Sequence, residues 1–270
     1  MATTLMLNNL FGKTLRDQRW ALLGWAVGLV LLALYLAYIF PFVNRAAEMM
    51  KVLETLPPAI KNLVGKSAFM ATPEGFFNLQ PFSILLPLLF IIFAIARGSD
   101  ATAGEEERGT LDLLLANPLP RRRLVAEKSL AHAVALFMLS VVFWLAMLGC
   151  TRWFGISLHA GRLAAVIFSC WLLGMTFYAL ALACGCWRGK KKFSIGVSGG
   201  LAMITFLINA YAPMVASLRP WRVLSPFYFY NGNNVLGNGL IPAHALLLAL
   251  LAAFFFLAAV FAFGRRDLSS

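Results

Sequence analysis

Long apolar runs alternate with short polar segments along this chain. Charged side chains are almost absent from residues 20–42, 79–97, 129–151, 163–186, 194–217 and 241–263. Each run has about the ~20 residues that a helix needs to cross a hydrocarbon layer of ~30 Å. The pattern therefore predicts an all-α membrane protein, a single domain over residues 1–270 with six transmembrane helices.

The segment before the first apolar run is amphipathic. Leu7, Leu10, Phe11 and Leu15 recur at helical spacing, while polar residues such as Lys13 occupy the other faces. This pattern is typical of a short helix that lies flat in the membrane interface. We therefore expect an N-terminal interfacial helix ahead of the six spans.

Two connections between spans are longer than simple loops, namely residues 45–78 and 218–240. The first contains two amphipathic stretches separated by Pro57-Pro58, and we expect it to cap the outer ends of the spans. The second is aromatic ahead of a turn rich in Gly and Asn. It fits either an aromatic belt at the outer interface or a partly inserted hairpin, and the sequence leaves both open.

Composition and charge agree with a membrane protein and add its orientation. Apolar residues make up 61% of the chain and charged residues 13%, far from the usual balance of soluble domains. Fifteen of the 23 Lys and Arg residues lie in the termini or in the connections on the same side. Since basic residues are enriched in cytoplasmic segments, both termini and residues 99–128 are expected to be cytoplasmic. The net charge of +12 then indicates contact with anionic membrane lipids, and no compact basic domain is present for nucleic acid.

Several function classes lack their chemistry in this chain. No Asp or Glu falls inside the six runs and no polar ring lines them, which argues against an ion-coupled carrier or a passive channel. Gly65-Lys66-Ser67 resembles the end of a phosphate-binding loop, but Ile60 stands where the earlier glycine is required. Neither a catalytic constellation nor metal-ligand spacing is present. We expect a chain that is not an enzyme and binds no cofactor or metal itself.

The connection at residues 99–128 carries a predicted helix between the second and third spans. Glu105, Glu106 and Glu107 are expected to begin it, where negative charge favours the helix dipole. Three leucines share one face of this helix, namely Leu111, Leu114 and Leu115. Burying each would contribute ~1.5–3 kcal/mol, so we expect something outside the lipid to cover them.

Asn117-Pro118 is expected to end that helix, and Pro120 suits the first turn of a second short helix. The second helix would carry Arg121, Arg122 and Arg123 at its positive end, where they oppose the dipole. Lipid head-group phosphates or an acidic protein surface would offset that cost.

This connection resembles a known family. Its sequence is similar to the motif after the second span of type-2 ABC-transporter permeases, over Glu107-Arg108-Gly109-Thr110-Leu111-Asp112-Leu113-Leu114, then Asn117-Pro118 and the basic run. Weaker similarities are present at Ser225-Pro226-Phe227-Tyr228 and at Phe263-Gly264-Arg265-Arg266-Asp267-Leu268. The resemblance covers the whole chain, including the interfacial helix, the six spans and the long outer segments.

The resemblance implies a membrane subunit of an ABC exporter in a bacterial or archaeal plasma membrane. Two copies, or two homologous subunits, would form one translocation path above two copies of a separate ATPase, which uses ATP and Mg. The family assigns the contact with this ATPase to the connection after the second span. Here the corresponding residues are Glu105, Glu106, Glu107, Arg108, Gly109, Thr110, Leu111, Asp112, Leu114, Leu115, Pro118, Arg121, Arg122 and Arg123.

We expect transport of a hydrophobic or amphipathic compound, such as a drug, an antibiotic or a lipid-like molecule, out of the cell. Candidate path residues are Phe82, Phe206, Asn209 and Tyr228, although a hydrogen bond to another helix also explains Asn209 in an apolar run. The alternative function is a membrane scaffold or assembly factor that recruits a cytoplasmic protein without transport. A partner with a phosphate-binding loop and ligand-dependent hydrolysis distinguishes the two functions.

Overall fold

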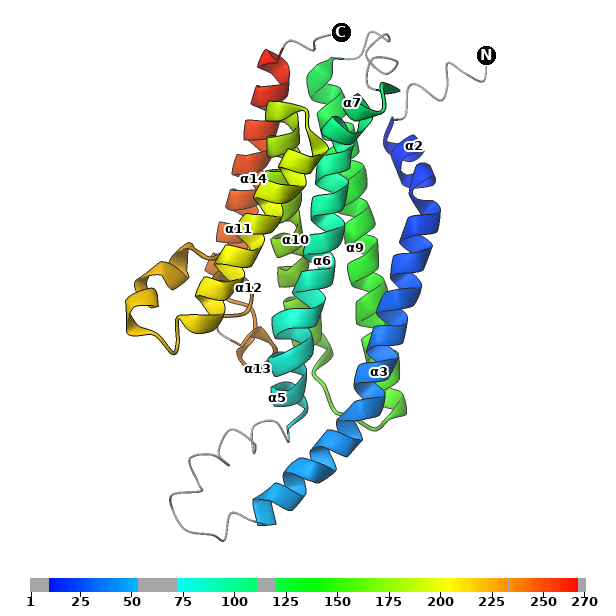
Figure 1. The fold of residues 1–270 in the computed structure, drawn as a ribbon. Coiled ribbons are helices and arrows are strands. Elements are labelled where there is room, and N and C mark those ends of the chain that lie inside the picture. Colours follow the sequence, from blue (N-terminus) through cyan, green and yellow to red (C-terminus); the bar gives the residue numbers. More distant parts are fainter. Residues whose placement is uncertain (1–9, 53–71, 111–119, 233, 267–270) are drawn as a thin grey trace.

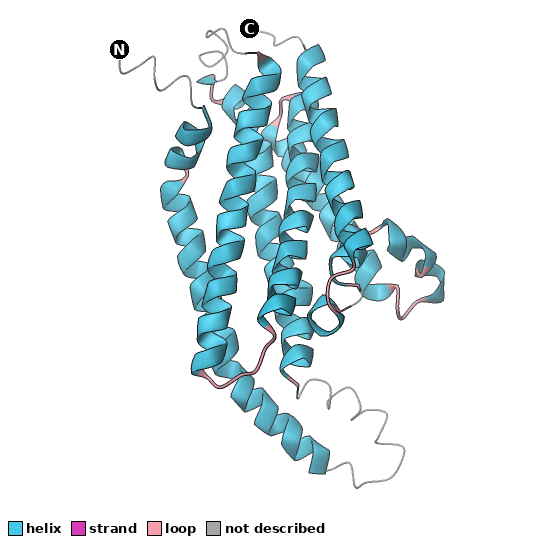
Figure 2. Ribbon diagram, turned by 180° about the vertical axis from the view of Figure 1, so that it is seen from behind, coloured by secondary structure: helices cyan, strands magenta, loops and turns pink. Residues whose placement is uncertain are grey.

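The computed structural model describes residues 10–52, 72–110, 120–232 and 234–266 as a bundle of helices (Figure 1). Viewed from behind, the described parts contain helices and loops and no strand (Figure 2). Among the described residues, six helices are long and apolar enough to cross a membrane, which confirms the predicted all-α, six-span fold. These six are Arg19–Arg45 within α3, the continuous run Pro73–Glu107, α9 (Arg121–Trp153), α10 (Ala160–Arg188), α11 (Lys191–Tyr211) and α14 (Pro242–Arg265).

The predicted N-terminal helix is present as α2, Leu10–Asp17. Leu10 is buried and Leu15 half-buried, while Lys13 and Arg16 are exposed, so the helix is amphipathic as its spacing indicates. Leu7 lies outside the described residues. α2 packs against α9 and leads into α3, Arg19–Val52, which bends away from the bundle in its lower part (Figure 1). Pro41 lies inside α3, and a proline there removes a backbone hydrogen bond and bends the helix.

The second span is one continuous helical run with two wider turns. It consists of α5 (Pro73–Phe77), the π-helical η2 (Asn78–Leu85), α6 (Leu86–Ser99), the π-helical η3 (Asp100–Gly104) and α7 (Glu105–Glu107). Thr72 caps its start, because its hydroxyl accepts a hydrogen bond from the Gly75 backbone nitrogen at 3.1 Å. The helical run ends at Glu107, ten residues past the predicted end of this span at residue 97.

α10 forms the centre of the bundle. In the most apolar 18-residue stretch of α10, 72% of the residues are buried, against 17% in the corresponding stretches of α11 and α14. α6 approaches it closely at Gly98, where an added Cβ would lie 2.5 Å from the backbone oxygen of Tyr178. Only glycine permits this distance between the two backbones, a common device where helices pack within membranes.

The connection between α11 and α14 folds into four short helices, namely η4 (Ala216–Leu218), η5 (Pro220–Leu224), α12 (Pro226–Asn231) and α13 (Val235–Asn238). α12 and α13 pack against α10, beside the half of the bundle that lies farther from α7 (Figure 1). Phe227 of α12 contacts both Phe177 of α10 and Phe206 of α11, with ring centroids 5.9 and 5.4 Å apart. The Tyr230 hydroxyl donates to the Phe82 carbonyl at 2.6 Å. Phe227 and Tyr230 of α12 are thus buried in the bundle, whereas Trp221 of η5 is exposed.

α11 ends at Tyr211, before the predicted end of the fifth span at residue 217. Asn209 therefore lies near the end of its helix and not in the middle of a span, as its place in the apolar run suggested. Its side-chain oxygen accepts a hydrogen bond from Nε of Arg222 in η5 at 3.2 Å. The hydrogen-bonding interpretation of Asn209 fits, although the donor belongs to a short connecting helix.

Candidate functional site

α7 lies at the same end of the bundle as α2 and the last turn of α14 (Figure 1). We call this the α7 end. The helix stops after Glu107, because Gly109 adopts a left-handed conformation with φ of 67° and its nitrogen donates to the Glu106 carbonyl at 3.0 Å. The prediction that the three glutamates begin a helix is therefore wrong. They end one, where the helix dipole disfavours negative charge, so cationic partners are needed.

The three glutamates, which we call the glutamate cluster, contact three different spans. Glu105 forms an ion pair with Lys128 of α9. Glu106 accepts from Arg266, just past the end of α14, with 3.0 Å between Oε2 and Nη1. Glu107 accepts from the backbone nitrogen of Lys191, the first residue of α11, at 2.9 Å. The end of the second span is thus connected to the ends of the third, fifth and sixth.

Asp100 is the first residue of η3, directly before α7, and it adds a second set of charged contacts. Its carboxylate accepts two hydrogen bonds from Arg108, at 2.9 and 3.2 Å, and one from Nζ of Lys191 at 2.8 Å. The hydrogen bonds to Asp100 raise the pKa of the Arg108 guanidinium above its ordinary value. Gly104 makes room for this arrangement, because a Cβ there would overlap the Asp100 carboxylate.

Lys128 connects this cluster to the N-terminal helix. It is only 3% exposed, and its Nζ also donates to the Ala101 carbonyl at 2.9 Å. The Lys128 carbonyl lies 2.7 Å from Nδ1 of His132, and Nε2 of His132 lies 3.1 Å from the Gln18 side chain at the end of α2. A polar cavity of about 210 Å³ lies among these residues. Polar contacts therefore run from α2 through α9 to the glutamate cluster.

The sequence predicted a separate short helix for the basic run. This prediction is wrong, because Arg121, Arg122 and Arg123 form the beginning of α9 itself. The helix continues because Leu124 and Val125, directly after the arginines, are buried in the bundle. Arg121 donates to the backbone oxygen of Arg266 at 2.6 Å, and Arg123 pairs with Glu127 within the same helix.

Part of the predicted coupling segment lies outside the described residues. These positions are Leu111, Asp112, Leu114, Leu115 and Pro118. Thr110 is the last residue described before them, and its hydroxyl donates to the Glu105 carbonyl at 3.2 Å. The described part of the segment is therefore the turn that delivers the chain to these residues.

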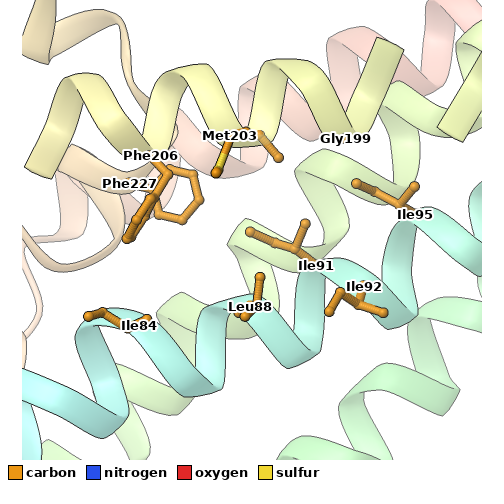
Figure 3. Close-up of a pocket in the computed structure, with 10 residues that line it drawn as sticks. Ile84, Leu88, Ile91, Ile92, Ile95, Gly199, Met203, Phe206 and Phe227 are labelled. Carbon is orange, nitrogen blue, oxygen red and sulfur yellow. The ribbon is translucent and has the colours of Figure 1, made fainter. Parts of the chain in front are cut away.

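An apolar cavity of about 410 Å³ lies between α6 and α11, with α12 at one side (Figure 3). Figure 3 shows Ile84, Leu88 and Ile91 facing Met203 and Phe206 across it, with Phe227 beside Phe206. We call this space the apolar cavity. Hydrophobic walls with almost no polar group suit an apolar or amphipathic ligand.

Of the four predicted path residues, Phe206 lines the apolar cavity. Phe82 is fully buried and contacts Phe143 of α9. Tyr228 packs on His244 with ring centroids 5.4 Å apart and lies under the Arg222 guanidinium. The structure thus brings one of the four to the cavity and places Phe82, Asn209 and Tyr228 in other contacts.

Comparison with known proteins agrees with this architecture. The family model described as ABC-2 family transporter protein matches residues 8–268. The chain belongs to this family. Its curated relatives include a probable ABC transporter permease protein NosY of Pseudomonas aeruginosa, 30% identical over 69% of this chain and 76% of the relative. A second probable NosY permease protein, from Stutzerimonas stutzeri, is 25% identical over 79% of this chain and 76% of its own.

The ABC-2 protein described here is thus a multi-pass membrane permease subunit of an ABC transporter, as the motif resemblance predicts. Membership implies that it pairs with an ABC ATPase subunit and is consistent with a subunit that is not itself an enzyme. Within the described residues of the permease, no group of three or more His, Cys, Asp or Glu side chains could hold a metal ion.

Four charged residues of the permease site were missed by the sequence reasoning, namely Asp100, Lys128, Lys191 and Arg266. Asp100 and Lys128 lie at the borders of the second and third apolar runs, where charges are expected for topology alone. No local spacing pairs Asp100 with Arg108, because eight residues exceed the three- or four-residue spacing of neighbouring side chains on a helix, and the two meet only through the turn after Glu107. No local signal pairs Lys128 with Glu105, which approach only through tertiary packing.

Proposed function

We propose that this permease subunit exports a hydrophobic or amphipathic compound, driven by ATP and Mg in two copies of a partner ATPase. A second permease copy or a homologous subunit completes the path. The observation that carries the proposal is the glutamate cluster, in which three consecutive carboxylates engage three other spans.

In this proposal the α7 end faces the cytoplasm, in a bacterial or archaeal plasma membrane. The excess of Lys and Arg on that side supports the orientation. The turn at Gly109 then carries the chain from the bundle into residues 111–119, and the leucines of that segment dock on the ATPase. The predicted coupling role of residues 105–123 follows from the same arrangement.

The contacts of α7 suggest how motion of the ATPase reaches the path. A displacement of the chain after Gly109 acts on α7, and α7 is joined to α9, α11 and the end of α14. α6 and α7 belong to one helical run, and α6 lines the apolar cavity opposite α11. The glutamate cluster therefore lies between the docking segment and both walls of the cavity.

The poor burial of α11 supports a second permease subunit beside the apolar cavity. Met203 and Ile204 are 60% and 55% exposed on a helix that lies next to the cavity. Lipid can cover such a surface, but a second subunit would also enclose the cavity and separate the cargo from lipid. In this arrangement each subunit contributes one α6–α11 wall.

The decisive experiment is purification of the permease from its host together with its cytoplasmic partner, followed by reconstitution into liposomes. We expect a partner with a phosphate-binding loop, ATP hydrolysis stimulated by amphipathic fluorescent dyes, and, with ATP added outside, dye movement into the liposome lumen by complexes whose ATPase faces outward. A partner without ATPase activity would overturn the proposal and favour the scaffold function.

Coupling is tested with Glu106→Gln, which removes the charge that pairs with Arg266. We expect bound ATPase with hydrolysis near its basal rate but dye-stimulated hydrolysis and transport reduced about tenfold, as for a lost charged contact of ~1.5 kcal/mol. Glu74→Gln is the matched control with the same charge change, because Glu74 lies in the first turn of α5, at the opposite end of the same helical run. Equal losses in the two variants would contradict the coupling role of the cluster.

A further inference from the structure

An open groove at the α7 end lies between the beginning of α9 and the last turns of α14. Its volume is about 510 Å³. One wall is formed by Pro120, Arg121 and Arg122, and the other by Val260, Phe261, Gly264 and Arg265. We call it the arginine groove. None of its residues lines the apolar cavity or belongs to the glutamate cluster.

Three arginines line the arginine groove, namely Arg121, Arg122 and Arg265, and no carboxylate from the described residues lines it. The nearby described carboxylates are occupied by other cations. Glu106 pairs with Arg266, and Glu127 with Arg123. Three like charges that share one groove repel each other, so an anion that enters it is stabilised by all three.

The opposite wall of the groove is apolar. Phe261 is 59% exposed one turn before Arg265, whose guanidinium lies 4.0 Å from the Phe261 ring centroid. The exposed apolar face continues along α14 with Leu257 and Phe254, 64% exposed each. The groove is therefore cationic at its rim and apolar along the helix that leads into the membrane.

These two properties distinguish between possible occupants. A soluble anion or an acidic protein surface would use the guanidinium groups alone and leave the apolar wall in water. A phospholipid uses both, because its phosphate binds arginine while its acyl chain lies along the span. The charge complementarity favours a lipid with a net negative charge over a zwitterionic one.

We propose that the arginine groove binds one anionic phospholipid of the inner leaflet. The phosphate lies between Arg121, Arg122 and Arg265, and an acyl chain follows Phe261 along α14. The assignment to the inner leaflet rests on the proposed orientation. Because Arg121 also donates to the Arg266 carbonyl, and Arg266 holds Glu106, the bound lipid lies next to the contacts of the glutamate cluster.

The test uses the purified full-length chain without ATPase, delipidated in detergent and titrated with phosphatidylglycerol or phosphatidylcholine under native mass spectrometry. We expect one phosphatidylglycerol to bind preferentially. Arg122→Gln should lower its affinity about fivefold, the effect of one basic residue near an anionic lipid. Arg123→Gln is the matched control with the same charge change, because Arg123 pairs with Glu127 and does not line the groove.

A second variant separates occupancy of the groove from charge. Gly264→Phe keeps every arginine, and no atom lies within 4 Å of an added Cβ at this helical position, so a side chain can begin there without a clash. The new ring would occupy the groove, and we expect the bound phosphatidylglycerol to be lost. Thermal unfolding of each variant verifies that it is folded.

Three results would overturn the proposal. Equal effects of Arg122→Gln and Arg123→Gln would indicate general surface attraction. Undiminished lipid binding to Gly264→Phe would place the lipid elsewhere. Displacement of the lipid by millimolar inorganic phosphate would identify an anion site without an acyl contribution. Since lipid binding requires no hydrolysis, these results are independent of the ATPase and transport assays that test the proposed function.

Discussion

At the α7 end the second span is joined to its neighbours by carboxylate–cation contacts, whereas beside the apolar cavity the same span presents aliphatic side chains. The first region contains Asp100 and the glutamate cluster. The second presents Ile84, Leu88 and Ile92, each about half exposed. Directional contacts fix the relative positions of helix ends, while non-directional surfaces accept varied apolar partners.

The comparison suggests a division of roles within one helical run. At the α7 end, where motion of the ATPase would reach the permease, directional charged contacts fix the positions of the helix ends. Where cargo would pass, no polar group requires a fixed partner. The two regions are separated by the close contact of Gly98 with α10, which keeps α6 in place between them.

The largest expected effect is that of Lys128→Met. The side chain is buried, and its removal leaves Glu105 without its cation, so we expect a loss of ~3 kcal/mol in the free energy of unfolding. Unfolding in sodium dodecyl sulfate, followed by circular dichroism, measures it. The double variant Lys128→Met with Glu105→Gln should recover part of the loss, and a single variant as stable as the wild type would contradict the importance of this pair.

An intermediate effect is expected from alanine at two glycines, one at the contact between α6 and α10 and one beside the apolar cavity. Gly98→Ala forces Cβ against the Tyr178 carbonyl and should destabilise the bundle by ~1–3 kcal/mol. Gly199 lines the apolar cavity, and no atom lies within 4 Å of a Cβ added there. Gly199→Ala should therefore stabilise α11 by up to ~1 kcal/mol. The same unfolding assay applies to both, and equal changes would contradict the difference in packing at these two positions.

The smallest effect is expected for Tyr230→Phe. This change removes the hydrogen bond from the hydroxyl to the Phe82 carbonyl but keeps the buried ring, so we expect a loss of ~1 kcal/mol. Tyr228→Phe is a control, because the Tyr228 ring lies partly exposed among His244, Phe229 and Arg222. A loss for Tyr228→Phe as large as that for Tyr230→Phe would contradict the importance of the buried hydrogen bond of Tyr230.

The six spans could be predicted because long charge-free runs have one stable arrangement in a membrane. Their ends were less accessible. Apolar composition stops near Arg97, but the helix continues for ten more residues through η3 because Ala101, Thr102 and Ala103 are buried against the bundle. That continuation explains why the glutamates end a helix and do not begin one.

The charged site was only partly predictable for a related reason. The motif identified Glu105 to Arg108, yet Lys128, Lys191 and Arg266, which pair with the three glutamates, lie on or directly after three other spans. Periodicity within one helix carries no information about which distant cation meets which carboxylate. Arg121 to Arg123 were assigned to a helix of their own because Pro120 begins a helix equally well at a short segment or at a span.

The enclosure of α10 has a consequence for the history of this sequence. A helix surrounded by protein on most sides tolerates few changes in side-chain volume. α14 is mostly exposed, so one apolar side chain can replace another on its outer surface. Substitutions accumulated in related permeases should therefore be sparse along Ala160–Arg188 and frequent on the outer surface of Pro242–Arg265. Among the six spans, α10 would accumulate substitutions most slowly.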